Sequence, residues 1–301
     1  YWPKEAKIIQ VDMNSDRIGL AKKILVGICG DAKLVAQQIL SQLSSTAGDV
    51  GREDRKALIH QTKSSWLQTL TSLDHEDDDE GTSWNKESRE RDPDRMSPRM
   101  AWRAIQAGLP EDAIISSDIG NNCAIGNAYP TFEKGRKYLA PGLFGPCGYG
   151  FPSVLGAKIG CPDTPVIGFS GDGAFGISMS EMTSCNREEW PNITMVIFRN
   201  YQWGAEKRNT TLWYDNNFIG TELDPKLSYA KIAEACGFKG VKATTQSELT
   251  EALKTSCVGQ MNGITTFIEV ILNQELGEPF RRDAMKAPVE VAGIVSSDMQ
   301  V

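Results

Sequence analysis

The chain carries its strongest structural signal in Pro165-Val166-Ile167-Gly168-Phe169-Ser170-Gly171-Asp172-Gly173, an apolar run that enters a glycine turn with an acid. The first five of these residues are typical of a short buried strand. Residues from about 175 to 187 are predicted to form a helix and 193–198 a second strand, with Asn200 just after it. Parallel strands need a crossover of this size, and such crossovers are right-handed. We therefore expect Asp172 and Asn200 to lie side by side at the carboxyl ends of neighbouring strands, where open α/β sheets bind ligands.

These two side chains suit a hard cation. Asp172 supplies a charged oxygen and Asn200 a neutral one, and Mg2+ takes few protein ligands and completes its octahedron with water and substrate phosphates. Gly171 and Gly173 let the backbone approach a diphosphate, and the helix that follows offers its N-terminal amides to an anion. A lone Gly-Asp-Gly would favour the alternative of an ordinary turn. The strand, helix, second strand and Asn200 together favour a metal–diphosphate site.

The same residues resemble a known family. Residues 171–175, continued by 198–202, resemble the metal–diphosphate motif of the thiamine diphosphate enzymes. Residues 145–152 with 156–160 resemble the segment that supports the bend of this cofactor in the acetolactate synthase-like branch. Within that branch the chain is similar to the sulfoacetaldehyde acetyltransferases. The stretches that carry this narrower likeness are 116–127, 200–209 and 273–282.

The resemblance implies a magnesium site made by the side chains of Asp172 and Asn200 and by the backbone carbonyl of Gln202. Most relatives end the second strand with two asparagines and use the second as the ligand, whereas this chain has Arg199-Asn200. We assign the ligand to Asn200 because it is the only amide in the turn before Gln202.

The resemblance also implies which residues contact thiamine diphosphate. Residues 119–122 contact the diphosphate end. Gly145 offers its carbonyl to the aminopyrimidine, and Cys147 stands where relatives place a bulky Met or Leu under the bend. The alternative for 145–150 is a glycine-rich turn before a helix. The full expected set is Ile119, Gly120, Asn121, Asn122, Gly145, Cys147, Gly171, Asp172, Gly173, Ala174, Asn200 and Gln202.

By the same resemblance, the expected reaction converts sulfoacetaldehyde and phosphate to acetyl phosphate and sulfite through a thiamine diphosphate adduct. The glutamate that activates the cofactor in this family lies in an amino-terminal domain, usually of a neighbouring subunit, so we name no catalytic acid or base in this chain. Both substrates are anions, which calls for cationic side chains. We call residues 200–202, which carry two of the expected metal ligands, the metal turn. The candidates beside it are Arg199, Lys207 and Arg208, with Arg281 and Arg282 as a second pair. The alternative for each is a surface charge or a tie to an acidic neighbour.

Two other functions stay open at this point. One is a 2-oxo acid enzyme of the acetolactate synthase type with the same cofactor. The other is a truncated cofactor-binding module that is inactive without a missing domain or partner subunit. Because the family assembles its sites between subunits, a homodimer or homotetramer is expected.

The composition indicates a water-soluble enzyme domain. The chain has 301 residues, 40% of them hydrophobic, and a net charge of −7. An acidic chain with a pI near 5.1 argues against nucleic acid or an anionic membrane as the main partner. It has no apolar stretch of about 18 residues and no visible signal peptide. Seven cysteines without a Cys-x-x-Cys pair indicate reduced thiols in a cytoplasm, and His60 and His75 are predicted to be solvated.

The chain is predicted to have three parts. Residues 1–45 are the end of a Rossmann-like central domain, with strands near 6–12 and 26 and a helix to 43. Residues 46–98 are a helical and charged linker, with a helix over 52–73 and an acidic run at 74–81. Residues 99–301 alternate helices and strands and form the thiamine diphosphate-binding domain, a doubly wound parallel α/β sheet. Because the chain opens at Tyr1 without Met, we interpret it as the carboxyl-terminal half of a longer polypeptide.

Overall fold

The computed structural model describes residues 5–43, 51–73, 83–132, 137–142, 144–214 and 216–276. The chain divides into two compact units, and the second begins at Gln68, inside the predicted linker. The acidic run at 74–81 lies outside the described residues, as do Arg281 and Arg282. Among the described helices, none combines the length and the apolar character that crossing a bilayer requires.

The first unit is a small α/β element. Strands β1 (Ile9–Asp12) and β2 (Val26–Cys29) pair in parallel and are separated by the short 3-10 helix η1 (Ser15–Arg17). Helix α1 (Ala32–Gln42) follows, and Asp31 caps it by accepting hydrogen bonds from two amides of its first turn. Helix α2 (Arg52–Ser72) comes next in the chain. A parallel strand pair with a helix is the arrangement expected for a fragment of a Rossmann-like domain.

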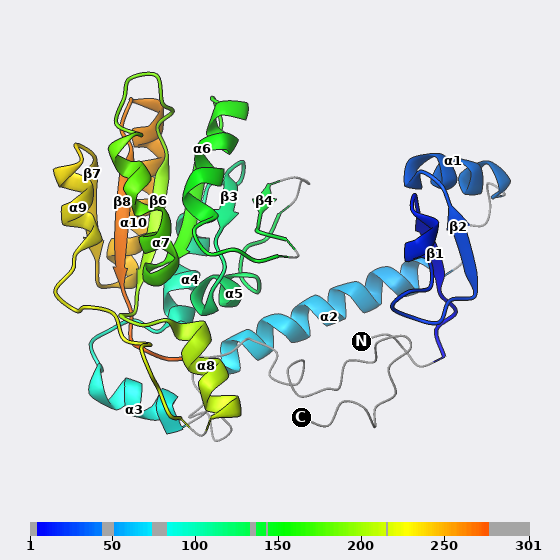
Figure 1. Ribbon diagram of the computed structural model, residues 1–301, viewed down its shortest axis with the longest axis horizontal. Helices are drawn as coiled ribbons and strands as arrows, with labels where there is room; N and C mark the ends of the chain where they lie inside the picture. Colours follow the sequence, from blue (N-terminus) through cyan, green and yellow to red (C-terminus); the bar gives the residue numbers. More distant parts are fainter. Residues whose placement is uncertain are drawn as a thin grey trace. The chain divides into compact units, whose positions relative to one another are not determined.

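The second unit is built on a six-stranded sheet in which every pair is parallel. The strand order is β4-β3-β5-β6-β8-β7, with β4 and β7 at opposite edges (Figure 1). The chain runs from β3 out to β4 and returns to β5 on the other side of β3; after β6 it runs out to β7 and returns to β8. The strands are β3 (Ile114–Ser117), β4 (Tyr138–Leu139), β5 (Val166–Gly171), β6 (Thr194–Arg199), β7 (Lys239–Ala243) and β8 (Thr266–Ile271). The predicted doubly wound parallel sheet is confirmed.

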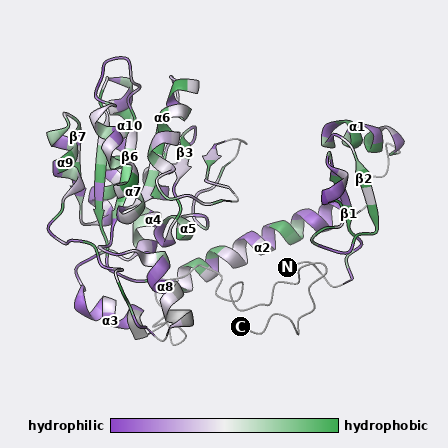
Figure 2. Cartoon of the chain, viewed as in Figure 1, coloured by the Kyte–Doolittle hydropathy of each residue, from purple (hydrophilic) through white to green (hydrophobic). Residues whose placement is uncertain are grey.

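Helices cover both faces of this sheet, so its central strands are hydrophobic on both sides. In β6, Val196 and Phe198 belong to one apolar cluster, while Met195 and Ile197 belong to the other. Helices α4 and α10 contribute to the first cluster and α6 and α9 to the second, and the hydropathy colouring shows the strands as the apolar centre of the unit (Figure 2). The helices are α3 (Ser83–Arg91), α4 (Pro98–Gly108), α5 (Asn121–Gly126), α6 (Gly150–Gly160), α7 (Asp172–Ser178), η2 (Met179–Thr183), α8 (Gly204–Trp213), α9 (Tyr229–Ala235) and α10 (Gln246–Met261).

Some boundaries differ from the sequence prediction. The helix predicted from about 175 to 187 begins at Asp172, because Gly171 is extended and an acid in the first turn suits the helix dipole; it changes to 3-10 geometry at Met179. The sequence predicts a helix that opens at Ser247, whereas α10 is capped two residues earlier, by a capping box made by Thr245 and Glu248. Helix α8 was not predicted.

Helix α3 lies in the predicted linker but is bound to the second unit. The side chain of Asn85 accepts a hydrogen bond from the amide of Leu276 at 2.8 Å, and Ser88 accepts one from the amide of Gln274 at 2.8 Å. Both polar side chains are buried. The segment that follows β8 is therefore held against α3.

Candidate active site

All the residues predicted to contact the cofactor lie in one pocket at the carboxyl ends of β3, β5 and β6. Helices α5, α7 and α8 begin at its wall, one after each of these strands. The predicted residues that line the pocket are Ile119, Gly120, Asn121, Asn122, Gly145, Cys147, Gly171, Asp172, Gly173, Ala174, Asn200 and Gln202. The fold thus collects in one place four segments that are well separated in the sequence.

Three polar groups, from Asp172, Asn200 and Gln202, converge at the predicted metal position. The amide of Asn200 has two orientations, which differ by exchange of its oxygen and nitrogen. In one, the nitrogen donates to Asp172 Oδ1 at 3.2 Å and to the Gln202 carbonyl at 3.3 Å. In that orientation the Asn200 oxygen also accepts from Asn122 Nδ2 at 3.3 Å, so all of these groups are paired. A cation at this place would favour the exchanged orientation, in which the Asn200 oxygen faces Asp172 Oδ1 and the Gln202 carbonyl.

The carboxylate of Asp172 is buried and almost fully hydrogen-bonded. Its Oδ2 accepts from Arg199 Nη1 at 2.9 Å and from the Tyr201 amide at 2.7 Å, and its Oδ1 accepts from the Gly173 amide at 3.0 Å. Burial raises the pKa of Asp172 to about 6, and the hydrogen bond and charge of Arg199 act in the opposite direction. A cation at Oδ1 would further favour the ionised form.

The turn between β6 and α8 directs the Gln202 carbonyl toward these oxygens. Tyr201 has a φ of +62°, which is uncommon for a residue with a side chain. Its carbonyl accepts from the Leu223 amide at 2.9 Å, and the Trp203 amide donates to Thr221 at 2.8 Å. Because alternate residues of an antiparallel pair point their backbone groups in opposite directions, the carbonyl of Gln202 points away from the 221–223 segment.

A second buried carboxylate, Asp118, holds the glycine-rich segment against the sheet. Its Oδ2 accepts from the Gly150 amide at 2.9 Å and from Ser170 Oγ at 3.0 Å. Its Oδ1 accepts from the amides of Ile119 at 2.8 Å and Gly148 at 3.1 Å. One side chain therefore joins the ends of β3 and β5 to the loop that carries Gly145 and Cys147.

The pocket also offers groups for an anion. Asn121, at the start of α5, is 5% exposed, and both polar atoms of its side chain lack a hydrogen-bond partner in the structure. Buried polar atoms are normally hydrogen-bonded. The amides at the starts of α5, α7 and α8 add positive potential at the same wall. These features fit a diphosphate.

Two of the predicted substrate-binding cations, Arg199 and Lys207, have internal partners. Arg199 is fully buried, and besides Asp172 it donates to the carbonyls of Asp224 and Leu227. Lys207 is also fully buried and pairs with Glu222, and burial lowers the pKa of Lys207. Arg208 is 7% exposed. Among the described residues that line the pocket, these three cations are not found, so the structure does not bring Arg199, Lys207 or Arg208 to the pocket wall.

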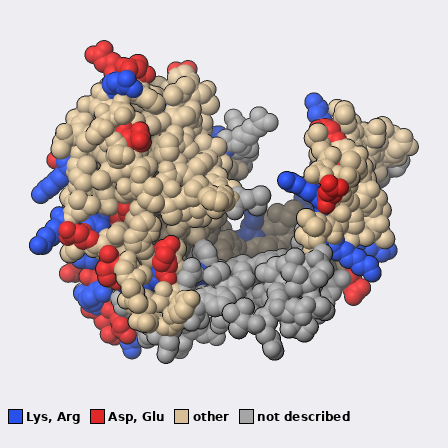
Figure 3. Space-filling view, in the orientation of Figure 1, with Lys and Arg blue, Asp and Glu red and all other residues tan. Residues whose placement is uncertain are grey.

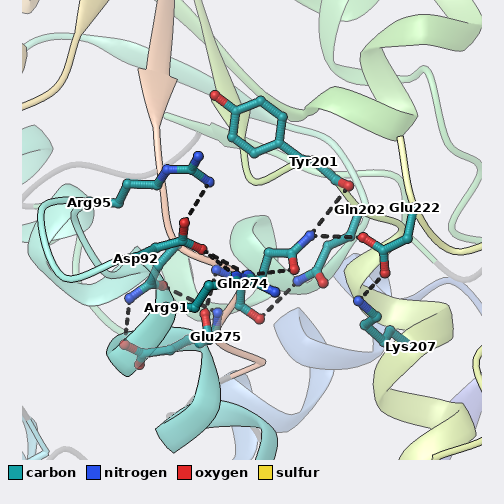
Figure 4. A network of polar contacts seen from close by, with 11 residues as sticks. Arg91, Asp92, Arg95, Tyr201, Gln202, Lys207, Glu222, Gln274 and Glu275 are labelled. Atoms are coloured by element: carbon teal, nitrogen blue, oxygen red, sulfur yellow. Dashed lines mark hydrogen bonds and ion pairs between the residues drawn. The ribbon is translucent and has the colours of Figure 1, made fainter. Parts of the chain in front are cut away.

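A polar network connects the metal turn with helix α3 (Figure 4). Gln202 Nε2 donates to the carbonyl of Gln274 at 3.0 Å, and Gln274 Nε2 donates to Glu222 at 3.0 Å. Arg91, on α3, donates to Gln274 Oε1 at 2.7 Å. Because Gln274 contacts both sides, it links α3 to the turn that carries the predicted metal ligands.

Sequence reasoning missed several residues of the pocket. Asp118, which directly follows β3 and holds the glycine-rich loop without lining the pocket, was not singled out either; an acid at the end of a strand was the signal available for it. The run 203–206 directly follows the metal turn, so recognising α8 would have placed it at the pocket. The wall residues that were not singled out are Cys123, Trp203, Gly204, Ala205 and Glu206.

Glu206 is the exposed acid of this wall. Burial, followed by the charges of Asp118 and Glu206, raises the pKa of the Cys147 thiol. Burial also raises the pKa of Cys123 to about 12. Both thiols are therefore uncharged near neutral pH, and they contribute apolar surface to the pocket rather than a thiolate.

Comparison with curated proteins identifies relatives along the whole chain. The "Probable sulfoacetaldehyde acetyltransferase" of Rhizobium meliloti (strain 1021) is 75% identical over 300 residues, covering 100% of this chain and 51% of that protein. The "Sulfoacetaldehyde acetyltransferase" of Roseovarius nubinhibens (strain ATCC BAA-591 / DSM 15170 / ISM) is 69% identical, covering 100% of this chain and 50% of that protein. The chain spans about half the length of the curated relatives it matches.

A solved structure supports the fold. The Rhodococcus jostii RHA1 thiamine diphosphate-dependent 4-hydroxybenzoylformate decarboxylase aligns with a TM-score of 0.55 and 24% identity, over 61% of this chain and 34% of that chain. Residues 118–270 match the family described as "Thiamine pyrophosphate enzyme, C-terminal TPP binding domain". The matched range begins at Asp118 and contains the complete pocket. The chain therefore belongs to the thiamine pyrophosphate enzymes, and its residues 118–270 are their C-terminal TPP binding domain.

Proposed function

We propose that this protein is a sulfoacetaldehyde acetyltransferase, which converts sulfoacetaldehyde and phosphate to acetyl phosphate and sulfite. The observation that carries the proposal is the high identity, over the full length of this chain, with two relatives of that name. The pocket supports it, because its groups suit a diphosphate cofactor with a divalent cation. The specific reaction belongs to the proposal, since the chain covers only half of those relatives.

The three converging polar groups support Mg2+ as the metal. Asp172 Oδ1 and the Gln202 carbonyl lie 3.2 and 3.3 Å from the side-chain atom of Asn200 that faces them. Neighbouring ligands of an octahedral cation with bonds of roughly 2.1 Å are about 3 Å apart. One carboxylate, one amide and one carbonyl leave the other positions to the cofactor diphosphate and water, so we assign the metal ligands to Asp172, Asn200 and Gln202.

The remaining pocket residues would hold thiamine diphosphate. The unpaired amide of Asn121 and the starting amides of α5 and α7 suit the diphosphate. Gly145, with a φ of +64°, and Cys147 lie on the other wall, where we propose that they contact the pyrimidine end and the bend. When bound, the cofactor supplies the carbanion chemistry, and the protein supplies position and electrostatics.

Glu206 is this chain's candidate for proton transfer. Loss of sulfite and formation of an acetyl group both require that a proton is moved near the reacting carbon, and a positioned carboxyl group performs such transfers. Of the two carboxylates among the described residues of the pocket wall, Asp172 is buried and hydrogen-bonded, whereas Glu206 is exposed. Glu206 is thus available to substrate.

Anionic substrates call for positive potential in the pocket. The helices α5, α7 and α8 begin at its wall, and their N-termini supply such potential. Arg208 lies further along α8 and stays a candidate from the resemblance.

We further propose a homodimer or homotetramer in a reducing compartment such as the cytoplasm. Charged side chains are sparse on the visible front of the second unit, where α6 and α7 lie (Figure 3). Ile159 on α6 and Ile177 on α7 are 61% and 59% exposed. Exposed apolar side chains such as these are available to pack against another subunit. All seven cysteines are free thiols, which suits a reducing environment.

Calorimetric titration with thiamine diphosphate, with and without Mg2+, tests the cofactor assignment. We expect binding that requires Mg2+ and that Asp172→Ala abolishes. Asp163→Ala, a change of an exposed aspartate before β5, serves as the matched control and should bind like the unchanged protein. Binding that is indifferent to both Mg2+ and Asp172 would contradict the assignment.

The reaction is tested separately. We expect acetyl phosphate and sulfite in equal amounts from sulfoacetaldehyde and phosphate. Acetolactate formed from pyruvate, without acetyl phosphate from sulfoacetaldehyde, would instead assign the protein to 2-oxo acid chemistry. The two assays share the cofactor and differ only in the substrates supplied.

A further inference from the structure

Three buried charges lie at the carboxyl ends of three adjacent strands. Arg199, the last residue of β6, is 2.9 Å from Asp172 Oδ2 and 3.8 Å from Glu269 Oε1. The side chains of Arg199, Asp172 and Glu269 are 0, 1 and 3% exposed. Strands β5, β6 and β8 are neighbours in the sheet. Arg199 lies in β6 and Glu269 in β8, and Asp172 directly follows β5. The array holds two carboxylates for one guanidinium.

The hydrogen bonds of Asp172 leave it one position for a metal. Each carboxylate oxygen has two lone pairs. Those of Oδ2 are occupied by Arg199 Nη1 and by the Tyr201 amide, and one of Oδ1 is occupied by the Gly173 amide. The remaining lone pair belongs to Oδ1, the oxygen that faces Asn200. Asp172 can therefore bind a cation through one oxygen only.

The guanidinium is fixed in this position. It donates to the carbonyls of Asp224 and Leu227, and it lies over the ring of Tyr201 at 4.2 Å from the centroid. Glu269, on its other side, accepts from Ser228 Oγ at 2.7 Å and from the Ala230 amide at 3.2 Å. Because Arg199 and Glu269 are both held by other groups, Arg199 cannot rotate away from Asp172 to admit a second metal–carboxylate bond.

We infer that Arg199 is a positioning residue that restricts Asp172 to a single metal-facing oxygen and thereby makes the site selective for small octahedral cations such as Mg2+ over Ca2+. This inference rests on the proposed function, because it concerns the metal of the proposed cofactor site. Glu269 supports it by offsetting the positive charge of Arg199.

The chemistry of the two cations explains the selectivity. Mg2+ demands six ligands in near-ideal octahedral geometry and accepts single carboxylate oxygens. Ca2+ takes six to eight oxygens and often binds a carboxylate through both oxygens. The guanidinium, together with the Tyr201 amide, occupies the second oxygen, so it disfavours the larger cation that would use both oxygens.

The test measures metal preference through cofactor binding rather than through turnover. Thiamine diphosphate is titrated into the protein at a series of Mg2+ or Ca2+ concentrations. Calorimetry then gives the apparent dissociation constant of each metal. Arg199→Met removes the charge and the donors, Arg199→Lys keeps a charge and a donor, and Lys158→Met removes a buried cation elsewhere. Lys158 is 3% exposed and bonds the Thr164 carbonyl.

We expect Arg199→Met to shift the Mg2+/Ca2+ preference toward Ca2+ by about tenfold, while Arg199→Lys and Lys158→Met keep the original preference. If Arg199→Met does not fold because two carboxylates are left buried without a cation, the double variant Arg199→Met with Glu269→Gln removes one of them and should show the same shift. An unchanged preference in the folded Met variant overturns the inference.

The same titration separates failure of the inference from failure of the proposed function. If the unchanged protein binds thiamine diphosphate without any divalent metal, the metal site and the inference are overturned, while the acetyl phosphate assay still decides the proposed reaction. If it binds with Mg2+, shows the expected shift in the variant, and yet forms no acetyl phosphate, only the proposed acetyl transfer is overturned.

Discussion

The indole ring of Trp203 lies so close to Gly173 that a β-carbon on residue 173 would be 2.9 Å from two atoms of the ring. The backbone of Trp203 is held on both sides, since its amide donates to Thr221 and its carbonyl accepts from Lys207. Both residues line the pocket. A glycine is therefore required at this position by the packing of the β6–α8 turn against the start of α7.

Gly173→Ala should consequently displace the Trp203 ring from the pocket wall. Overpacking of this kind lowers the free energy of unfolding by about 1–3 kcal/mol, and we expect weaker thiamine diphosphate binding. Chemical denaturation and calorimetry measure the two effects. Gly156→Ala, on α6, is the matched control, because a β-carbon there meets no atom within 4 Å.

A second change separates the ring from other causes. In the double variant Gly173→Ala with Trp203→Leu, the smaller side chain makes room for the new methyl group, and stability should recover in part. No recovery would show that the close approach to Trp203 is not the reason for the glycine.

The carboxylate of Asp118 gives the next prediction. In Asp118→Asn, a side-chain NH2 group replaces one oxygen and must face donors that now bond to that oxygen, namely the Gly150 amide and Ser170 or the amides of Ile119 and Gly148. Leaving buried donors unpaired costs about 1–3 kcal/mol. Denaturant unfolding should show this loss, and the exposed Asp163→Asn should not. Equal stability of the two variants would contradict the role assigned to Asp118.

The sheet could be predicted because its strands are apolar on both faces. Runs such as 193–198 and 265–271 contain almost only strand-forming residues, and the alternation of Val196 and Phe198 with Met195 and Ile197 between two cores explains why. Helix α8 was harder to predict, since 204–213 has no apolar stripe and mixes Gly, Thr, Lys and Arg. The turn after β6, which ends in the N-cap residue Trp203, positions the start of α8. Tertiary contacts of this kind override local helix propensity.

The sequence predicted which residues form the candidate site, but not the hydrogen bonds and ion pairs between them. Gly171, Asp172 and Asn200 stand at strand ends, and parallel topology brings strand ends together. The partners of Arg199 could not be read from the sequence, because Glu269 and Asp224 are distant along the chain and meet it only through the strand order β5-β6-β8. An arginine beside a metal turn looks like a substrate-binding group until its acceptors are known.

Gln274 is predicted to couple helix α3 to the metal turn. Its side chain contacts Arg91 and Glu222, and its carbonyl accepts from Gln202. Gln274→Ala removes the side-chain bonds and keeps the backbone bond. We expect hydrogen exchange in α3 to accelerate about tenfold, which corresponds to about 1.4 kcal/mol for hydrogen bonds that include a charged partner.

Exchange in β5 should stay unchanged in that variant, because β5 lies in the centre of the sheet. The control is Asn262→Ala, an exposed amide that bonds its own helix at Val258. Equal exchange of α3 in both variants would show that the backbone contacts of Gln274 alone hold the helix.

Glu206 gives the prediction that bears most directly on catalysis. The residue lies on the pocket wall with an exposed side chain and follows the metal turn on α8. If it transfers a proton, Glu206→Gln should lower kcat for acetyl phosphate formation by about 100-fold or more, because positioned acid–base groups contribute roughly 10²–10⁴-fold. Binding of thiamine diphosphate should be nearly unchanged, since Glu206 is not among the assigned metal ligands. The matched control Glu181→Gln, in η2 outside the described pocket lining, should leave kcat intact. A variant at Glu206 that loses cofactor affinity but keeps kcat at saturating cofactor would assign the residue to binding instead of proton transfer.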